Sequence, residues 1–127
     1  MIHMTIDEFR EMQGLKETTS KYGNQKTKVD GIDFDSEKEA LRYAELRMLE
    51  KAGAIQDLQL QKRFELQPAF YHNGHKQRPI YYVCDFFYIE KGKYIIEDVK
   101  SAATKNNAVY KLKRKMMLYR GYEIRET

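Results

Sequence analysis

The sequence predicts an α+β fold, and three observations carry this prediction. Residues 37–52 and residues 109–119 each have the pattern of a helix. Between them lie runs of aromatic and β-branched residues separated by hairpin dipeptides, a pattern typical of an antiparallel meander. At 127 residues the chain is long enough for one hydrophobic core but not for two.

The N-terminal part predicts a short helix followed by a linker. Thr5 is a plausible N-cap with Glu8 three positions later, so we expect a helix over residues 5–13. Residues 14–28 are polar and contain two glycines. We therefore predict residues 1–28 as a short helix and a flexible basic arm, and residues 29–127 as a single domain. Three lysines of the arm are candidate contacts to a nucleic-acid backbone, with a plain solvated linker as the alternative: Lys21, Lys26 and Lys28.

The next segment predicts a hairpin and then a long helix. Asp30-Gly31 suits a type I′ turn. Ser36 and Glu39 form a capping-box pattern at the start of a helix that runs to about Ala52. Apolar residues occur nearly all round this helix, which predicts that it is largely buried. Glu39 therefore has two interpretations, a capping residue or an acid that faces a functional site.

Residues 81–100 contain the strongest chemical signal. They predict a β-hairpin with a turn at Lys91-Gly92, which places Asp85 directly opposite Asp98, with Cβ atoms about 5 Å apart. Two carboxylates on one face repel unless a cation lies between them. Alternation puts Lys100 on the same face as Asp98. A divalent metal site is one interpretation, and a solvated face with Lys100 as a salt-bridge partner is the other.

The same alternation assigns the neighbouring residues. Tyr82, Cys84 and Glu97 are expected on the opposite face of the hairpin. Asn73-Gly74 predicts a turn that joins a preceding strand, residues 64–71, so that Asp85 lies in the central strand of a three-stranded meander. His72 and His75 flank this turn. They have no carboxylate or thiol nearby, so we assign them to the turn rather than to a metal.

The C-terminal part is basic. Residues 99–127 carry eight Lys or Arg and two acids, in a chain of net charge +4. Residues 101–107 predict a mobile loop, residues 109–119 a helix that ends at Gly121, and residues 122–125 a last strand. Four residues here are candidate phosphate contacts, with a solvated helix face as the alternative: Lys105, Lys111, Arg114 and Lys115.

Composition also bears on the compartment. The single cysteine, Cys84, excludes an internal disulfide and a cysteine-based zinc site, so we expect a reducing cytoplasm. No apolar run approaches the length of a membrane span, and the N-terminus lacks the apolar core of a secretory signal. We therefore expect no membrane partner.

The order of these parts resembles the PD-(D/E)XK nuclease superfamily. The stretches KYGNQKTKVDGIDFDSEKEA, FELQPAF, VCDFFY and IIEDVKS further resemble small phage and prophage proteins of unknown function that are often grouped with Holliday-junction resolvase-like nucleases. The resemblance runs from about Lys21 to the C-terminus. It implies a restriction-endonuclease-like core, in which an N-terminal helix packs on a mixed sheet built from an antiparallel meander, followed by a basic helix and a last strand. Cys84 stands where the superfamily motif has proline.

The resemblance implies a site and an activity. By position, Glu39, Asp85, Asp98 and Lys100 match the catalytic residues of the superfamily. Mg²⁺, with Mn²⁺ as a substitute, is expected on Asp85, Asp98 and the Val99 carbonyl, with Glu39 possible through a water. The implied protein is a metal-dependent DNA endonuclease of the Holliday-junction resolvase type, a homodimer that processes phage DNA in the bacterial cytoplasm.

Other activities remain open at this point. A restriction-like or nicking nuclease would use the same residues. A DNA-binding module could keep the fold without catalysis, and an interaction protein could use the basic helix to dock a partner.

Overall fold

The computed structural model describes residues 4–13 and 26–127. The chain forms two compact units, residues 1–56 and residues 57–127. Together they contain helices and mixed sheets of mainly antiparallel strands, so the predicted α+β class is confirmed. The predicted domain division after residue 28 stays a prediction.

The first unit consists of two helices and a hairpin. They are α1 (Ile6–Gln13), β1 (Thr27–Val29), β2 (Ile32–Phe34) and α2 (Glu37–Lys51). The turn residues Asp30 and Gly31 have φ values of 52° and 76°, as a type I′ turn requires. The predicted hairpin and both helices are therefore confirmed.

Both helices of this unit begin where the capping patterns predict. The backbone N–H of Glu8 donates to the Thr5 hydroxyl at 3.1 Å, and the N–H of Glu39 donates to the Ser36 hydroxyl at 3.1 Å. Helix α2 packs on β1 and β2, and the ring of Tyr43 lies 5.1 Å from that of Phe34. Most of α2 is buried, in line with its nearly continuous apolar surface.

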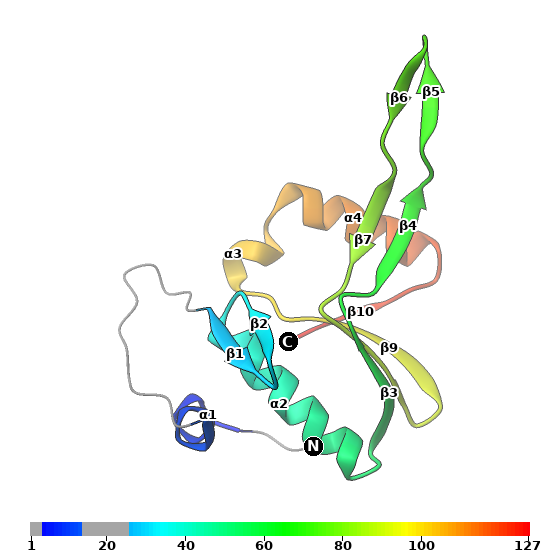
Figure 1. Cartoon of the computed structure of the whole chain (residues 1–127). Coiled ribbons are helices and arrows are strands. Elements are labelled where there is room, and N and C mark those ends of the chain that lie inside the picture. The colour runs from blue at the N-terminus through cyan, green and yellow to red at the C-terminus, as the bar shows by residue number, and fades with distance from the viewer. Residues whose placement is uncertain (1–3, 14–25) are drawn as a thin grey trace. The chain divides into compact units, whose positions relative to one another are not determined.

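A four-stranded mixed sheet in the order β10-β9-β8-β3 organises the second unit. Its strands are β3 (Ile55–Leu60), β8 (Phe86–Glu90), β9 (Lys93–Asp98) and β10 (Ile124–Glu126). Strands β8 and β9 are antiparallel around Lys91-Gly92, with the predicted register. Strand β10 is parallel to β9, because helices α3 (Ala102–Lys105) and α4 (Ala108–Tyr119) carry the chain across between them (Figure 1).

Helix α3 corrects the loop predicted for residues 101–107. Ser101 caps it, since its hydroxyl accepts from the Thr104 N–H while the Thr104 hydroxyl accepts from the Ser101 N–H. Threonine is not the usual residue at the third position of a capping box, so the pattern was not apparent in the sequence.

A two-stranded ribbon extends from the sheet. Strand β4 (Arg63–Gln67) pairs antiparallel with β7 (Ile80–Val83), and β5 (Phe70–His72) pairs with β6 (His75–Gln77) around the predicted Asn73-Gly74 turn (Figure 1). The predicted continuous central strand is wrong, because the chain breaks between β7 and β8. Strand β7 belongs to the ribbon, whereas β8 belongs to the four-stranded sheet.

The break changes the phase of alternation. Tyr82 and Cys84 join Phe87 and Ile96 in one buried cluster, which α4 covers through Met117. The prediction that Tyr82 and Cys84 face away from the Asp98 side is therefore wrong.

A distortion in the facing strand accompanies this break. Gln61, between β3 and β4, has a φ of 54°, and its N–H donates to the Asp85 carbonyl at 3.2 Å. A left-handed conformation at a residue other than glycine is strained and occurs often beside functional sites.

Candidate active site

Asp98 is the last residue of β9, and only 1% of its surface is exposed. Its Oδ1 accepts a hydrogen bond from the Asp85 backbone N–H at 2.8 Å, and its Oδ2 accepts one from the Tyr82 hydroxyl. A solvated face for this residue is therefore wrong. Charge-assisted bonds such as these offset part of the cost of burying a carboxylate.

Asp85 lies directly before β8 and faces Asp98. Its Oδ2 accepts from the Val99 N–H at 2.8 Å, so the side chain of each aspartate is bonded to the opposite segment. Burial, and next the negative charge of Asp98, raise the pKa of Asp85 to about 6. The hydrogen bond from Val99 and the charge of Lys100 lower the pKa of Asp85 but do not cancel these two causes. We call Asp85 and Asp98 the carboxylate pair.

Lys100 is the cation closest to this pair in the second unit. Its Nζ lies 3.9 Å from Asp98 Oδ2 and 4.5 Å from the centre of the Tyr110 ring. The Tyr110 hydroxyl donates to Glu126 at 2.7 Å, and burial and this bond raise the pKa of Tyr110. Strand β9 and helix α4 thus hold the ammonium beside Asp98, on the face that the sequence predicts.

A cavity of about 340 Å³ opens beside Lys100. Tyr82 lines it from β7, Tyr110 and Lys113 line it from α4, and Asn107 lines it as the N-cap of that helix. The cavity therefore joins Tyr82, which bonds the carboxylate pair, to the amide of Asn107 and the ammonium of Lys113, which are donors suited to a phosphate.

Glu97 lies on the opposite side of β9, as alternation predicts. It is fully buried, its Oε1 accepts from the Tyr88 hydroxyl, and its Oε2 accepts from the Thr127 hydroxyl at 3.2 Å. Arg125 donates in turn to the Tyr88 oxygen at 3.1 Å. This network connects β8, β9 and the C-terminus, so we assign it to the stability of the fold rather than to chemistry.

Two predicted ligands stay predictions. Glu39 begins α2 in the first unit, where its backbone N–H bonds Ser36. The structure gives the Val99 N–H a partner in Asp85.

The predicted DNA-contacting residues fall into two groups. In the second unit Lys105, Lys111 and Lys115 are exposed, whereas Arg114 is half-buried, with its guanidinium 4.0 Å from Glu126. In the first unit Lys28 lies 3.9 Å from Asp33, and Lys26 is exposed. Lys21 lies outside the described residues. The DNA contacts predicted for these residues stay predictions.

Sequence reasoning missed four residues of this site. Tyr82 could not be found, because its position depends on the phase change at Asp85. Asn107, Tyr110 and Lys113 recur at intervals of three on α4, which places them on one face. That spacing was a usable signal.

The donor set fits a hard divalent cation. Mg²⁺ is usually held by one or two carboxylates together with waters and substrate phosphates. Within residues 4–13 and 26–127 no group of three or more His, Cys, Asp or Glu side chains surrounds a common point, so a cation at the carboxylate pair would have these two carboxylates as its acidic ligands among those residues. His72 and His75 are exposed on the β5–β6 turn. The geometry that suits a cation here is the pair of facing carboxylates, each bonded to the backbone of the opposite segment.

None of the helices in the described part is long and apolar enough to span a membrane.

Comparisons with known proteins identify the family of the chain. Searches of curated proteins and of solved structures found no match. A protein-family comparison matches residues 19–127, most of the chain. The chain thus belongs to the family described as "Protein of unknown function (DUF1064)".

Proposed function

We propose that this protein is a metal-dependent DNA endonuclease of the PD-(D/E)XK type. The observation that carries the proposal is the carboxylate pair: Asp85 and Asp98 face each other across two strand ends, and Lys100 lies 3.9 Å from Asp98. A site for hydrolysing phosphodiesters needs acidic ligands and a nearby cation, and both occur together here.

Asp85 and Asp98 are the residues that would hold Mg²⁺, or Mn²⁺ in its place. Such an ion lowers the pKa of a bound water and stabilises the charge that develops on the phosphate. Each carboxylate already accepts a hydrogen bond from the backbone of the opposite segment, so both are oriented before any ligand arrives. A carboxylate has about four acceptor positions, so these bonds leave lone pairs for a metal.

Lys100 supplies the remaining charge. Its side chain is 21% exposed and borders the cavity, so its ammonium can reach a phosphate oxygen or orient an attacking water. It offsets negative charge in the transition state. Lys113 and Asn107 donate to the same phosphate from α4, and Tyr82 keeps the Asp98 carboxylate in place.

The substrate we propose is DNA, and branched DNA in particular. The exposed lysines of α3 and α4 provide contacts to the backbone without reading sequence. The resemblance to resolvase-like nucleases favours a four-way junction, which needs two active sites and hence a symmetric dimer. The setting we propose is phage or prophage DNA processing in a bacterial cytoplasm.

The second candidate is a DNA-binding module without catalysis. It would use the same exposed lysines. The carboxylate pair argues against it, because a protein that only binds phosphates gains nothing from two negative charges held together near the binding surface.

Incubation with labelled DNA tests the proposal. Four-way junction, linear duplex and single strand are each incubated with Mg²⁺, Mn²⁺ or EDTA, beside the Asp98→Ala protein. We expect paired symmetric nicks in the junction that disappear with EDTA and in the variant. Cutting of every substrate would instead favour a restriction-like or nicking nuclease. Binding of DNA without any metal-dependent product would refute the nuclease and favour the binding module.

A further inference from the structure

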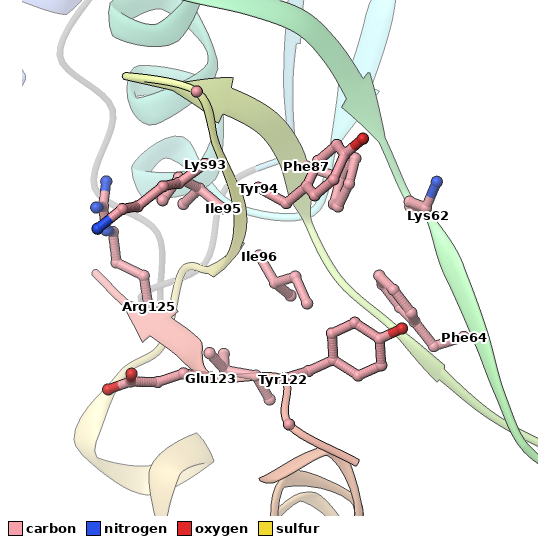
Figure 2. A pocket seen from close by; sticks show the side chains of 13 residues that line it. Lys62, Phe64, Phe87, Lys93, Tyr94, Ile95, Ile96, Tyr122, Glu123 and Arg125 are labelled. Carbon is pink, nitrogen blue, oxygen red and sulfur yellow. The ribbon is translucent and has the colours of Figure 1, made fainter.

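A second and larger hollow, of about 870 Å³, is lined by residues of β8, β9 and β10 (Figure 2). Ile96 and Ile124 lie at its base, on the adjacent strands β9 and β10. Neither the proposed chemistry nor the predicted DNA contacts use this surface, which we call the aromatic groove.

Four rings follow one another along the groove. Tyr94 stacks on Phe87 with centroids 5.5 Å apart and planes at 19°. Phe87 contacts Phe64 at 6.2 Å, and Phe64 contacts Tyr122 at 5.5 Å. In Figure 2 Tyr94 and Phe87 lie on one side of Ile96, and Phe64 and Tyr122 lie on another.

The two end rings are open to solvent. Tyr94 is 74% exposed and Tyr122 is 44% exposed, whereas Phe87 is buried. An exposed tyrosine supported by a stacked phenylalanine is a rigid platform with one free face. The ring is already ordered in the folded protein, so a flat ligand that stacks on it loses little further side-chain entropy.

Cations border the same groove. Lys62 places its ammonium 4.4 Å from the centre of the Phe87 ring, and Lys93 and Arg125 line the edge together with one acid, Glu123. Arg125 is paired with Glu90 at 3.3 Å, so these three cations meet two acids. Alternating flat rings and positive charges match the two repeating parts of a nucleic-acid strand, its bases and its phosphates. A partner helix or a second copy of the chain would match the rings but not this excess of positive charge.

The groove also continues toward the carboxylate pair. Ile96 and Asp98 are two residues apart on β9, so they share a face at a separation of about 7 Å. Asp85 lies directly before β8, the strand that carries Phe87. A strand lying along the rings would therefore approach the proposed catalytic residues.

We infer that the aromatic groove binds an unpaired DNA strand by stacking bases on Tyr94 and Tyr122. The inference rests on the proposed function only for the choice of DNA as the nucleic acid. It narrows the substrate to DNA with an unpaired segment, such as a branch point, a flap or a gap. Stacking accepts any base, because every base has a flat face.

The test is fluorescence anisotropy with a labelled oligothymidylate of about 15 nucleotides, in EDTA so that cleavage plays no part. We expect Tyr94→Ala and Tyr122→Ala each to weaken binding by roughly tenfold or more. Tyr94→Phe keeps the ring and should bind within about twofold of the parent protein.

Tyr119→Ala is the matched control, because Tyr119 is 93% exposed on α4 and does not line the groove. Absence of single-strand binding by the parent protein would overturn the inference, as would equal losses in Tyr94→Ala and Tyr119→Ala. The nuclease proposal is judged separately by cleavage with Mg²⁺. Single-strand binding without any cleavage would keep the groove and reject the nuclease, and junction cleavage without single-strand binding would do the reverse.

Discussion

Two adjacent acids on β9 have opposite surroundings. Glu97 and Asp98 are 0% and 1% exposed, respectively, so burial does not distinguish them. Hydroxyl groups of Tyr88 and Thr127 bond Glu97, and that network ties strands together. Asp98 instead faces a second carboxylate and the ammonium of Lys100. The difference teaches that the neighbours of a buried acid, rather than its burial, indicate function.

The largest expected difference in cleavage rate is between the Asp98→Asn and Glu97→Gln proteins. Both changes remove a charge and keep the shape. Asp98→Asn should lower the single-turnover cleavage rate by roughly 10³-fold or more, because it removes a proposed metal ligand. Glu97→Gln should change the rate by less than about threefold and lower the free energy of unfolding by roughly 1–3 kcal/mol. Equal losses of activity at constant fold would contradict the distinction.

Lys100→Ala comes next in size. The change removes the ammonium that lies 3.9 Å from Asp98 and that would offset negative charge in the transition state. We therefore expect the cleavage rate to fall by roughly 10²- to 10³-fold. Denaturant unfolding checks that stability changes little. Lys115→Ala is the control, because Lys115 is exposed on α4 and should alter only salt-dependent DNA affinity. A Lys100→Ala protein that cuts at the parental rate would remove this residue from the mechanism.

The stability of the metal-free protein should depend on pH through Asp85. Its pKa is raised from 3.8 to about 6, so the folded state holds this proton more tightly than the unfolded state does. The contribution is complete below about pH 4 and is lost as pH rises through 6, at a cost of roughly 2–3 kcal/mol. Chemical denaturation in EDTA across this range, compared with Asp85→Asn, isolates the effect. The prediction is wrong if the difference in free energy of unfolding between the parent protein and Asp85→Asn does not change with pH.

The smallest expected difference is between Tyr82→Phe and Tyr88→Phe, which make the same change on opposite sides of β9. Tyr82→Phe removes a donor to Asp98, and Tyr88→Phe removes a donor to Glu97. Each should lower the free energy of unfolding by about 1–3 kcal/mol. Only Tyr82→Phe should also lower cleavage, by about tenfold, because it loosens a proposed metal ligand. Similar cleavage by both variants would show that Tyr82 has no positioning role.

Local chemistry explains what the sequence could predict. Asp30-Gly31, Asn73-Gly74 and Lys91-Gly92 adopt positive φ angles at both residues, and such turns determine the register of their hairpins. The register around Lys91-Gly92 is enough to bring Asp85 and Asp98 together. The site was therefore accessible from one hairpin, before any tertiary contact was known.

Long-range packing explains what was missed. The break before β8 occurs opposite Gln61, which lies between β3 and β4 more than 20 residues earlier in the chain, and no pattern near Asp85 indicates it. Because the break shifts the alternation, Tyr82 was placed on the wrong face. Tyr110 meets Lys100 only after the chain has passed through α3 and entered α4. Contacts of this kind depend on how the elements pack rather than on their own sequence.

Metal binding tests the central claim most directly. Mn²⁺ is titrated into the protein with uncleavable phosphorothioate DNA, and free Mn²⁺ is followed by electron paramagnetic resonance. We expect binding by the parent protein and by Glu97→Gln, and a loss of binding in Asp98→Asn and Asp85→Asn. Equal Mn²⁺ binding by Asp98→Asn and the parent protein would show that the carboxylate pair is not a metal site, and the proposed chemistry would fall with it.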